Sequence, residues 1–149
     1  RDYSRKILDK AVERGIRTRE QADAVLARIL PTTDYADLTG SELVVEAVFE
    51  DQQIKAQVTA KAEAVLSEQA IFASNTSTLP ISGLAEASQR PDNFIGLHFF
   101  SPVDKMPLVE VIVGKQTSDE TLARSLDLVA QLRAEYAAAC AVPAWETAR

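Results

Sequence analysis

The sequence predicts an α/β fold in which a mainly parallel sheet is covered by helices. Continuous apolar runs, typical of strands buried on both faces, alternate with amphipathic helical stretches of about 10–15 residues. A chain of 149 residues is the length of one domain. Its composition, 46% hydrophobic and 26% charged, excludes a disordered or collagen-like chain.

The first 30 residues predict two helices. Apolar residues recur at helical spacing over residues 7–12, and Gly15 stands where a C-terminal cap would fall. Thr18 and Gln21 have the spacing of a capping box that opens the second helix, and Pro31 ends it.

Strands and helices alternate over the rest of the chain. Strands are predicted over residues 43–49, 70–73, 94–100 and 108–113, and helices over 51–66, 80–87 and from the capping box at 117–120 to 132. In the first of these helices we expect an ion pair between Asp51 and Lys55. Its expected inner face is Ile54, Val58, Ala62, Val65 and Leu66. The expected inner face of the last helix is Leu122, Leu126, Val129 and Leu132.

The charge pattern argues against a nucleic-acid partner. The chain carries 16 basic and 22 acidic residues, for a formal net charge of −6. Residues 1–30 hold eight basic and five acidic side chains, but these alternate along the predicted helices, as on a solvated helical face. The sequence shows neither a basic stripe nor an aromatic platform for nucleic acid.

Nothing in the sequence points to a membrane or to an oxidising compartment. No apolar run approaches the roughly 20 residues of a membrane helix, and the charged first residues exclude a secretory signal. The single cysteine, Cys140, excludes an internal disulfide. These features predict a cytoplasmic location.

Polar groups follow three of the predicted strands. Glu50 ends the first strand, the polar loop 74–77 follows the second, and His98 lies near the end of the third. Ligands of open α/β sheets bind beyond the carboxyl ends of the strands. We therefore expect these groups to converge on one site.

His98 is the only histidine of the chain, and its ordinary pKa would allow proton transfer near neutral pH. Glu110 interrupts an apolar strand, where an unpaired buried carboxylate would be costly, and it stands twelve residues after His98. A carboxylate bonded to one ring nitrogen would fix the tautomer of the imidazole. Glu46 also lies within an apolar predicted strand and could pair with His98 in the same way. Alternatively, His98 is structural and the glutamates face solvent at a sheet edge.

Ser77 could hydrogen-bond an oxygen of a substrate, although loops of this composition are also ordinary turns. The sequence has no G-x-S-x-G elbow of a serine hydrolase. It also has no metal-ligand spacing, because His98 and Cys140 lie 42 positions apart.

Four blocks of the sequence carry a family resemblance. They are EAVFE at 46–50, FASNTSTLPI at 72–81, IGLHFFSPV at 95–103 and MPLVEVI at 106–112. They resemble the NAD-binding domain of 3-hydroxyacyl-CoA dehydrogenase, above all the dehydrogenase part of bacterial multifunctional fatty-acid β-oxidation proteins. The resemblance covers roughly residues 1–133 and leaves 134–149 as a divergent tail. Four blocks in the right order and spacing are far more specific than any one of them.

The resemblance implies a Rossmann-type domain and the oxidation of a 3-hydroxyacyl-CoA to the 3-ketoacyl-CoA with NAD. In this family the histidine matching His98 takes the proton of the 3-hydroxyl, and the glutamate matching Glu110 orients it. The serine matching Ser77 bonds the substrate oxygen. The positions matching Glu50, Lys55 and Asn75 lie by the cofactor or the substrate.

Two departures from the family pattern predict an incomplete domain. No two of the five glycines are closer than 13 residues, so the first βαβ unit with its G-x-G-x-x-G turn is absent, and so is the acidic residue that follows it. We expect a fragment that binds NADH poorly and whose sheet has an unpaired inner edge. The tail 134–149 does not resemble the family's next strand or the segment that leads to its dimerisation domain, which a frameshift or truncated reading would explain.

The sequence thus predicts a fragment of an NAD-dependent 3-hydroxyacyl-CoA dehydrogenase acting on an acyl-CoA substrate. A homodimer or a multienzyme complex would form through the C-terminal segments that the fragment lacks. The alternative is a catalytically silent remnant or interaction module of the same fold. A third hypothesis, a 3-hydroxyacid dehydrogenase with a small non-CoA substrate, is less favoured because those enzymes usually rely on a lysine base.

Overall fold

A computed structural model of the chain describes residues 1–103, 106, 108–132 and 138–143. The chain divides into two compact units, Arg1–Asp34 and Tyr35–Arg149. Within the described residues, no helix is both long enough and apolar enough to cross a membrane.

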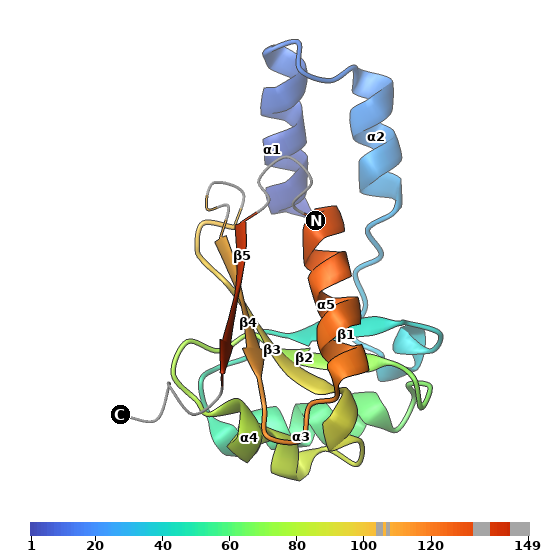
Figure 1. Ribbon diagram of the computed structural model, residues 1–149. Coiled ribbons are helices and arrows are strands. Elements are labelled where there is room, and N and C mark those ends of the chain that lie inside the picture. Colours follow the sequence, from blue (N-terminus) through green and yellow to red (C-terminus); the bar gives the residue numbers. More distant parts are fainter. Residues whose placement is uncertain (104–105, 107, 133–137, 144–149) are drawn as a thin grey trace. The chain divides into compact units, whose positions relative to one another are not determined.

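The first unit is a helical hairpin of α1 (Asp2–Glu13) and α2 (Arg19–Ala27) (Figure 1). Gly15 adopts a φ of +69° directly after the C-cap of α1, as a helix-terminating glycine does. Thr18 and Gln21 form the predicted capping box, with side chain and backbone bonded in both directions. Both caps are therefore confirmed. The hairpin closes on a small core of Leu8, Ala22 and Leu26.

The second unit is built on a five-stranded sheet in the order β1-β2-β3-β4-β5. Strands β1, β2 and β3 are parallel, β4 runs antiparallel to β3, and β5 is parallel to β4. The sheet is therefore mainly parallel, as predicted. The strands are β1 (Leu43–Glu46), β2 (Ile71–Ser74), β3 (Phe94–Phe99), β4 (Leu108–Val113) and β5 (Ala138–Pro143). The helices are η1 (Tyr35–Leu38), α3 (Gln52–Glu63), α4 (Ile81–Leu84), η2 (Ala85–Ala87), η3 (Pro91–Asn93) and α5 (Asp119–Leu132).

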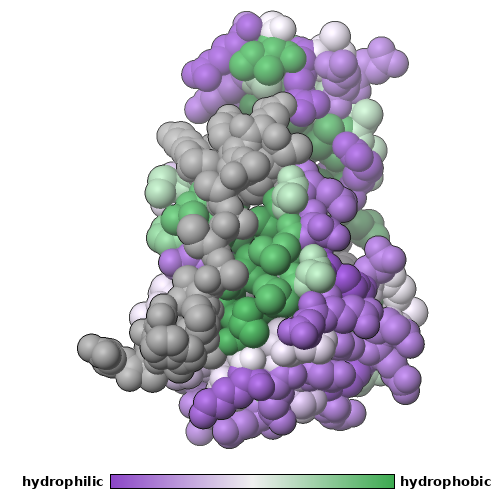
Figure 2. All heavy atoms as spheres, viewed as in Figure 1, coloured by the Kyte–Doolittle hydropathy of each residue, from purple (hydrophilic) through white to green (hydrophobic). Residues whose placement is uncertain are grey.

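Helices cover both faces of the sheet. Alternate residues of each strand point to opposite sides, so each strand contributes side chains to both layers. On one face, Phe72 and Phe94 pack with side chains of α3 and α4. On the other, Ile95 and Val111 pack with α5. In Figure 2, hydrophilic side chains cover the part of this unit where α3 and α4 lie, and apolar ones gather nearer to β4 and α5. Even-numbered residues of β3, among them His98, share the parity of Phe94 on the α3 face.

The first strand is shorter than predicted. It ends at Glu46 rather than continuing to residue 49, so Glu50 does not end a strand but lies in the loop that precedes α3. The backbone N–H of Val48 donates to Oε1 of Glu46 at 2.6 Å, which turns the chain out of the strand. Phe49 is consequently 83% exposed.

The predicted inner face of the helix is confirmed at Ala62 and Leu66, which are buried, but not over the first turns of α3. Ile54 is exposed and Val58 is only partly buried. The predicted pair of Asp51 with Lys55 is also wrong, because Asp51 is the N-cap and accepts from two backbone N–H groups. Polar side chains on the buried face find partners there instead. The buried residues of this region are Lys55, Thr59, Ala62, Glu63 and Leu66.

Helix α5 begins at Asp119, and Ser118 rather than Thr117 caps it through the backbone N–H of Thr121. Thr117 instead donates to the carbonyl of Phe94 at 2.6 Å, which ties the helix start to β3. Val129 is buried as predicted, but Leu132 is 59% exposed.

The chain beyond α5 contains a strand that its sequence did not predict. Residues 138–143 pair in parallel with β4, within the segment 134–149 that the sequence analysis left as a divergent tail. The rest of that tail, and residues 104, 105 and 107 of the predicted turn before β4, lie outside the described residues.

Candidate active site

A hollow of about 230 Å³ lies beyond the carboxyl ends of the three parallel strands. The loop after β1 contributes Glu50, the loop after β2 contributes Asn75 and Ser77, and β3 contributes His98. Parallel strands end at the same edge of a sheet, so the fold brings these groups together. The expected convergence of the three strand ends is confirmed.

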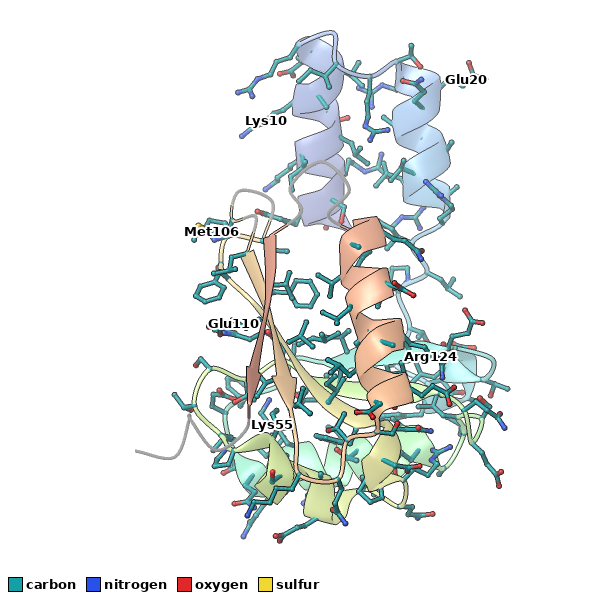
Figure 3. All side chains as sticks on the ribbon, in the orientation of Figure 1. Lys10, Glu20, Lys55, Met106, Glu110 and Arg124 are labelled. Atoms are coloured by element: carbon teal, nitrogen blue, oxygen red, sulfur yellow. The ribbon has the colours of Figure 1, made fainter. Side chains whose placement is uncertain are left out.

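His98 and Glu110 form a pair across the antiparallel strands β3 and β4. The two residues are direct register partners, and Nδ1 of His98 lies 2.7 Å from Oε2 of Glu110 (Glu110 is labelled in Figure 3). An ionised carboxylate only accepts hydrogen bonds, so we expect a neutral ring paired with it to carry its proton on Nδ1 and to keep the lone pair of Nε2. Within the described residues no group bonds to Nε2, and His98 lines the hollow.

The surroundings of the imidazole restrict its movement. The side chain of His98 is 17% exposed, and the ring of Phe100 packs against it with centroids 4.5 Å apart. Of the two glutamates that could have paired with His98, Glu46 is engaged elsewhere. The geometry is that of a preoriented base: a held ring with one open nitrogen.

Glu46 lies in a buried polar cluster at the ends of β1 and β2. Its carboxylate accepts from Nζ of Lys55 at 2.9 and 3.0 Å and from the hydroxyl of Ser74 at 2.7 Å. The side chains of Lys55 and Glu46 are each 1% exposed. A buried charge of this kind is tolerated only when it is paired and hydrogen-bonded.

Glu50 connects this cluster to the wall of the hollow. Its Oε2 lies 3.3 Å from Nζ of Lys55, while its Oε1 accepts from the hydroxyl of Thr76 at 2.6 Å and from the backbone N–H of Ser77 at 2.9 Å. Partial burial alone would raise the pKa of the Glu50 carboxyl, but these hydrogen bonds and the charge of Lys55 outweigh it and lower that pKa. Glu50 is therefore ionised near neutral pH.

Asn75 ties two strand ends together. Its backbone N–H donates to the carbonyl of Glu46 at 2.7 Å, and its Oδ1 accepts from the backbone N–H of Phe99 at 2.9 Å. The second bond fixes the backbone directly after His98. Within the described part of the chain, Nδ2 of Asn75 has no protein partner, so it can donate to a ligand.

The structure brings five of the six site residues predicted from the sequence to the hollow or its rim, and it places the sixth differently. His98, Ser77, Glu50 and Asn75 line the hollow, and Glu110 backs His98. Lys55 is enclosed behind Glu50 and is absent from the lining. The sequence analysis did not single out Ser74 and Thr76, whose hydroxyls donate to Glu46 and Glu50. A carboxylate inside an apolar strand needs hydrogen-bond donors nearby, and that need was the available signal.

The residues present fit the reactive end of a dinucleotide better than its phosphates. Nδ2 of Asn75 and the hydroxyl of Ser77 are donors for neutral oxygen atoms, whereas the Glu50 carboxylate would repel a phosphate. The glycine-rich turn that holds a pyrophosphate is absent from this sequence. The donors at the hollow therefore suit a neutral ring such as nicotinamide better than a pyrophosphate.

Comparison with known proteins identifies the same family as the sequence blocks. Residues 1–139 match the model of the "3-hydroxyacyl-CoA dehydrogenase, NAD binding domain". The chain is 51% identical over 124 residues to the fatty acid oxidation complex subunit alpha of Shewanella baltica, which covers 83% of this chain and 18% of that protein. The chain thus spans less than a fifth of this curated relative.

Solved structures share the fold. The (S)-3-hydroxybutyryl-CoA dehydrogenase of Ralstonia eutropha matches with a TM-score of 0.86 and 38% identity, over 93% of this chain and 48% of that one. The 3-hydroxybutyryl-CoA dehydrogenase of Escherichia coli matches with a TM-score of 0.82 and 31% identity, over 95% of this chain and 29% of that one. Both neighbours are dehydrogenases of hydroxylated acyl-CoA by their names.

Proposed function

Because the chain belongs to the 3-hydroxyacyl-CoA dehydrogenase family through its NAD-binding domain, we propose that it carries the proton-transfer site of an NAD-dependent oxidation of 3-hydroxyacyl-CoA to 3-ketoacyl-CoA. The observation that carries the proposal is the pair of His98 and Glu110 at a hollow that Asn75 and Ser77 also line.

In the proposed reaction His98 is the general base. Nε2 accepts the proton of the 3-hydroxyl as its oxygen becomes a carbonyl oxygen, and the resulting imidazolium is stabilised by the Glu110 carboxylate at Nδ1. When bound, NAD⁺ supplies the acceptor for the hydride that leaves C3. Ser77 donates a hydrogen bond to the substrate oxygen, and Asn75 supports the backbone that presents His98.

A lysine-based mechanism does not fit this site. Lys55 lies behind the hollow, where carboxylate and carbonyl oxygens surround its amino group and its side chain is 1% exposed. A histidine at the hollow and an enclosed lysine behind it support the CoA-linked dehydrogenase over the small hydroxyacid dehydrogenase.

The proposal extends to partners and compartment. A relative's name places it in a fatty acid oxidation complex, and we propose that this chain works in the cytoplasm as part of a larger multienzyme protein or a homodimer. Segments other than those of this chain would provide the pyrophosphate site and the subunit contacts.

The activity is tested in a hybrid subunit, in which this chain replaces the matched segment of the Shewanella baltica subunit alpha. NADH formation is followed with 3-hydroxyacyl-CoA substrates of several chain lengths. We expect turnover that requires both the acyl-CoA and NAD⁺. A hybrid subunit that folds, binds NADH and forms no NADH from any of these substrates would refute the proposed function.

Replacing Glu110 by glutamine in the hybrid subunit tests the pairing. Glutamine cannot offset the positive charge that His98 gains, so we expect a lower kcat, by about 10-fold or more. The exposed Glu120, replaced by glutamine, is the matched control. An unchanged kcat in Glu110→Gln would show that the pair has no part in proton transfer.

A further inference from the structure

Gly96 leaves room for a close approach between β3 and β4. It lies two residues before His98 on β3, and its register partner on β4 is Ile112. A Cβ atom at position 96 would lie 2.8 Å from Cβ of Ile112 and 2.7 Å from Cδ1 of Ile81. Ordinary contacts between carbon atoms are about 3.5–4.0 Å, so a side chain at position 96 would displace its neighbours.

The two neighbours of Gly96 differ in how easily they can move. The atoms of Ile81 that would be crowded, Cδ1 and Cγ1, belong to a side chain that can rotate. The crowded atom of Ile112 is its Cβ, which is bonded directly to the backbone of β4. It can move away only if the strand moves with it. A side chain at position 96 would therefore push β4 away from β3.

The pair of His98 and Glu110 lies next to this contact. Alternate residues of a strand share one face, so both pairs of partners are on the same side of the sheet, about 7 Å apart along the strands. Nδ1 of His98 and Oε2 of Glu110 are 2.7 Å apart. A widening of roughly 1 Å would lengthen this bond beyond about 3.5 Å, where a hydrogen bond is lost. Phe100 packs against the imidazole and limits how far the ring can follow Glu110.

We propose that Gly96 is a positioning residue. Because it has no side chain, it sets the spacing between β3 and β4 that keeps Glu110 within hydrogen-bonding distance of His98. The importance of this spacing for catalysis rests on the proposed function, but the spacing itself does not.

The test compares two ways of relieving the crowding that Gly96→Ala introduces into the 149-residue chain. Gly96→Ala combined with Ile112→Gly removes the opposing Cβ and leaves space into which Ile81 can turn. Gly96→Ala combined with Ile81→Ala removes the other obstacle and keeps the crowding between the strands. Each single variant completes its double-mutant cycle. Gly83→Ala, on α4, is the matched control, because a Cβ there would meet no atom closer than 4.0 Å.

The first measurement is nitrogen NMR of the imidazole, which is unambiguous because His98 is the only histidine of the chain. We expect Gly96→Ala to accelerate the exchange of the Nδ1 proton with water at least tenfold and to populate the tautomer protonated on Nε2. Ile112→Gly should reverse both changes, and Ile81→Ala should reverse neither. The Gly83→Ala control should match the original chain.

The second measurement is kcat of the hybrid subunit. We expect Gly96→Ala to lower it by about 10-fold or more, as Glu110→Gln does, because both substitutions remove the same hydrogen bond. The combination of Gly96→Ala with Glu110→Gln should then be no slower than Glu110→Gln alone. Overpacking that is unrelated to the pair would instead add its own loss to that of Glu110→Gln.

The NMR result decides the proposal separately from the proposed function. Loss of the Nδ1 hydrogen bond in Gly96→Ala that Ile112→Gly reverses supports it, even in a protein without dehydrogenase activity. An unchanged tautomer and exchange rate in Gly96→Ala overturn it, even where kcat falls. Failure of Ile112→Gly to restore the bond, or its restoration by Ile81→Ala, also overturns it, because the crowding would then not act through the strand spacing.

The proposal stays testable if Gly96→Ala alone does not fold. The comparison is then between Ile112→Gly and its combination with Gly96→Ala, followed by urea unfolding and by the same NMR measurement. A combined variant that folds with His98 bonded to Glu110 supports the proposal. A combined variant that does not fold, where Ile112→Gly does, overturns it.

Discussion

Replacing His98 by alanine lowers kcat of the hybrid subunit by at least about 100-fold, if the imidazole is the base. Nε2 has no described partner at the hollow, and Glu110 stabilises the charge that a proton would bring. Because proton transfer occurs in the transition state, kcat and kcat/KM fall together. The measurement is steady-state NADH formation over a range of pH.

A glutamine at position 98 separates proton transfer from packing. Glutamine fills part of the same space beside Phe100 and can hydrogen-bond Glu110, but it cannot accept a proton near neutral pH. We therefore expect His98→Gln to be as inactive as His98→Ala. Near-normal turnover of either variant would remove His98 from the mechanism.

Replacing Lys55 by methionine destabilises the 149-residue chain by about 3–5 kcal/mol, the cost typical of leaving a buried charge without its partner. The stranded charge is Glu46, which is 1% exposed and, among the residues that the structure describes, keeps the hydroxyl of Ser74 and the N–H of Val48 as its donors. The free energy of unfolding is measured in urea.

Adding Glu46→Gln to Lys55→Met removes that charge and restores most of the lost stability. Lys61→Met, which changes an exposed lysine of α3, stays within about 0.5 kcal/mol of the original chain. A Lys55→Met variant as stable as the Lys61→Met control would show that the buried pair contributes nothing to folding.

The sequence suggested the pairing of His98 and Glu110 but left Glu46 as an alternative partner, and the register of β3 against β4 decides between the two. The convergence of Glu50, Asn75, Ser77 and His98 followed from the common direction of parallel strands. In both cases the order and direction of the strands place these side chains near one another.

The role of Lys55 could not be predicted in the same way. The spacing of apolar residues predicted that Ile54, and not Lys55, lies on the inner face of α3. The i,i+4 spacing of charges predicted Asp51 as the partner of the lysine, but Asp51 caps the helix. The actual partner, Glu46, lies on a neighbouring strand. The ion pair between Glu46 and Lys55 forms only when the strand and the helix pack together, so local sequence patterns do not reveal it.

The strand over residues 138–143 escaped prediction for a related reason. Alanine has little preference for a strand, and the segment forms one by pairing with β4, whose apolar residues the sequence does reveal. Pairing with β4, rather than the strand preference of residues 138–143 themselves, determines that this segment is a strand.

The tautomer of His98 is the most direct test of the central claim, and the chain has no other histidine to confuse its nitrogen NMR spectrum. At a pH where the ring is neutral, we expect a proton on Nδ1, held by Glu110, and an unprotonated Nε2 facing the hollow. A neutral ring that carries its proton on Nε2 would have no lone pair to offer a substrate hydroxyl at that position, and would contradict the mechanism.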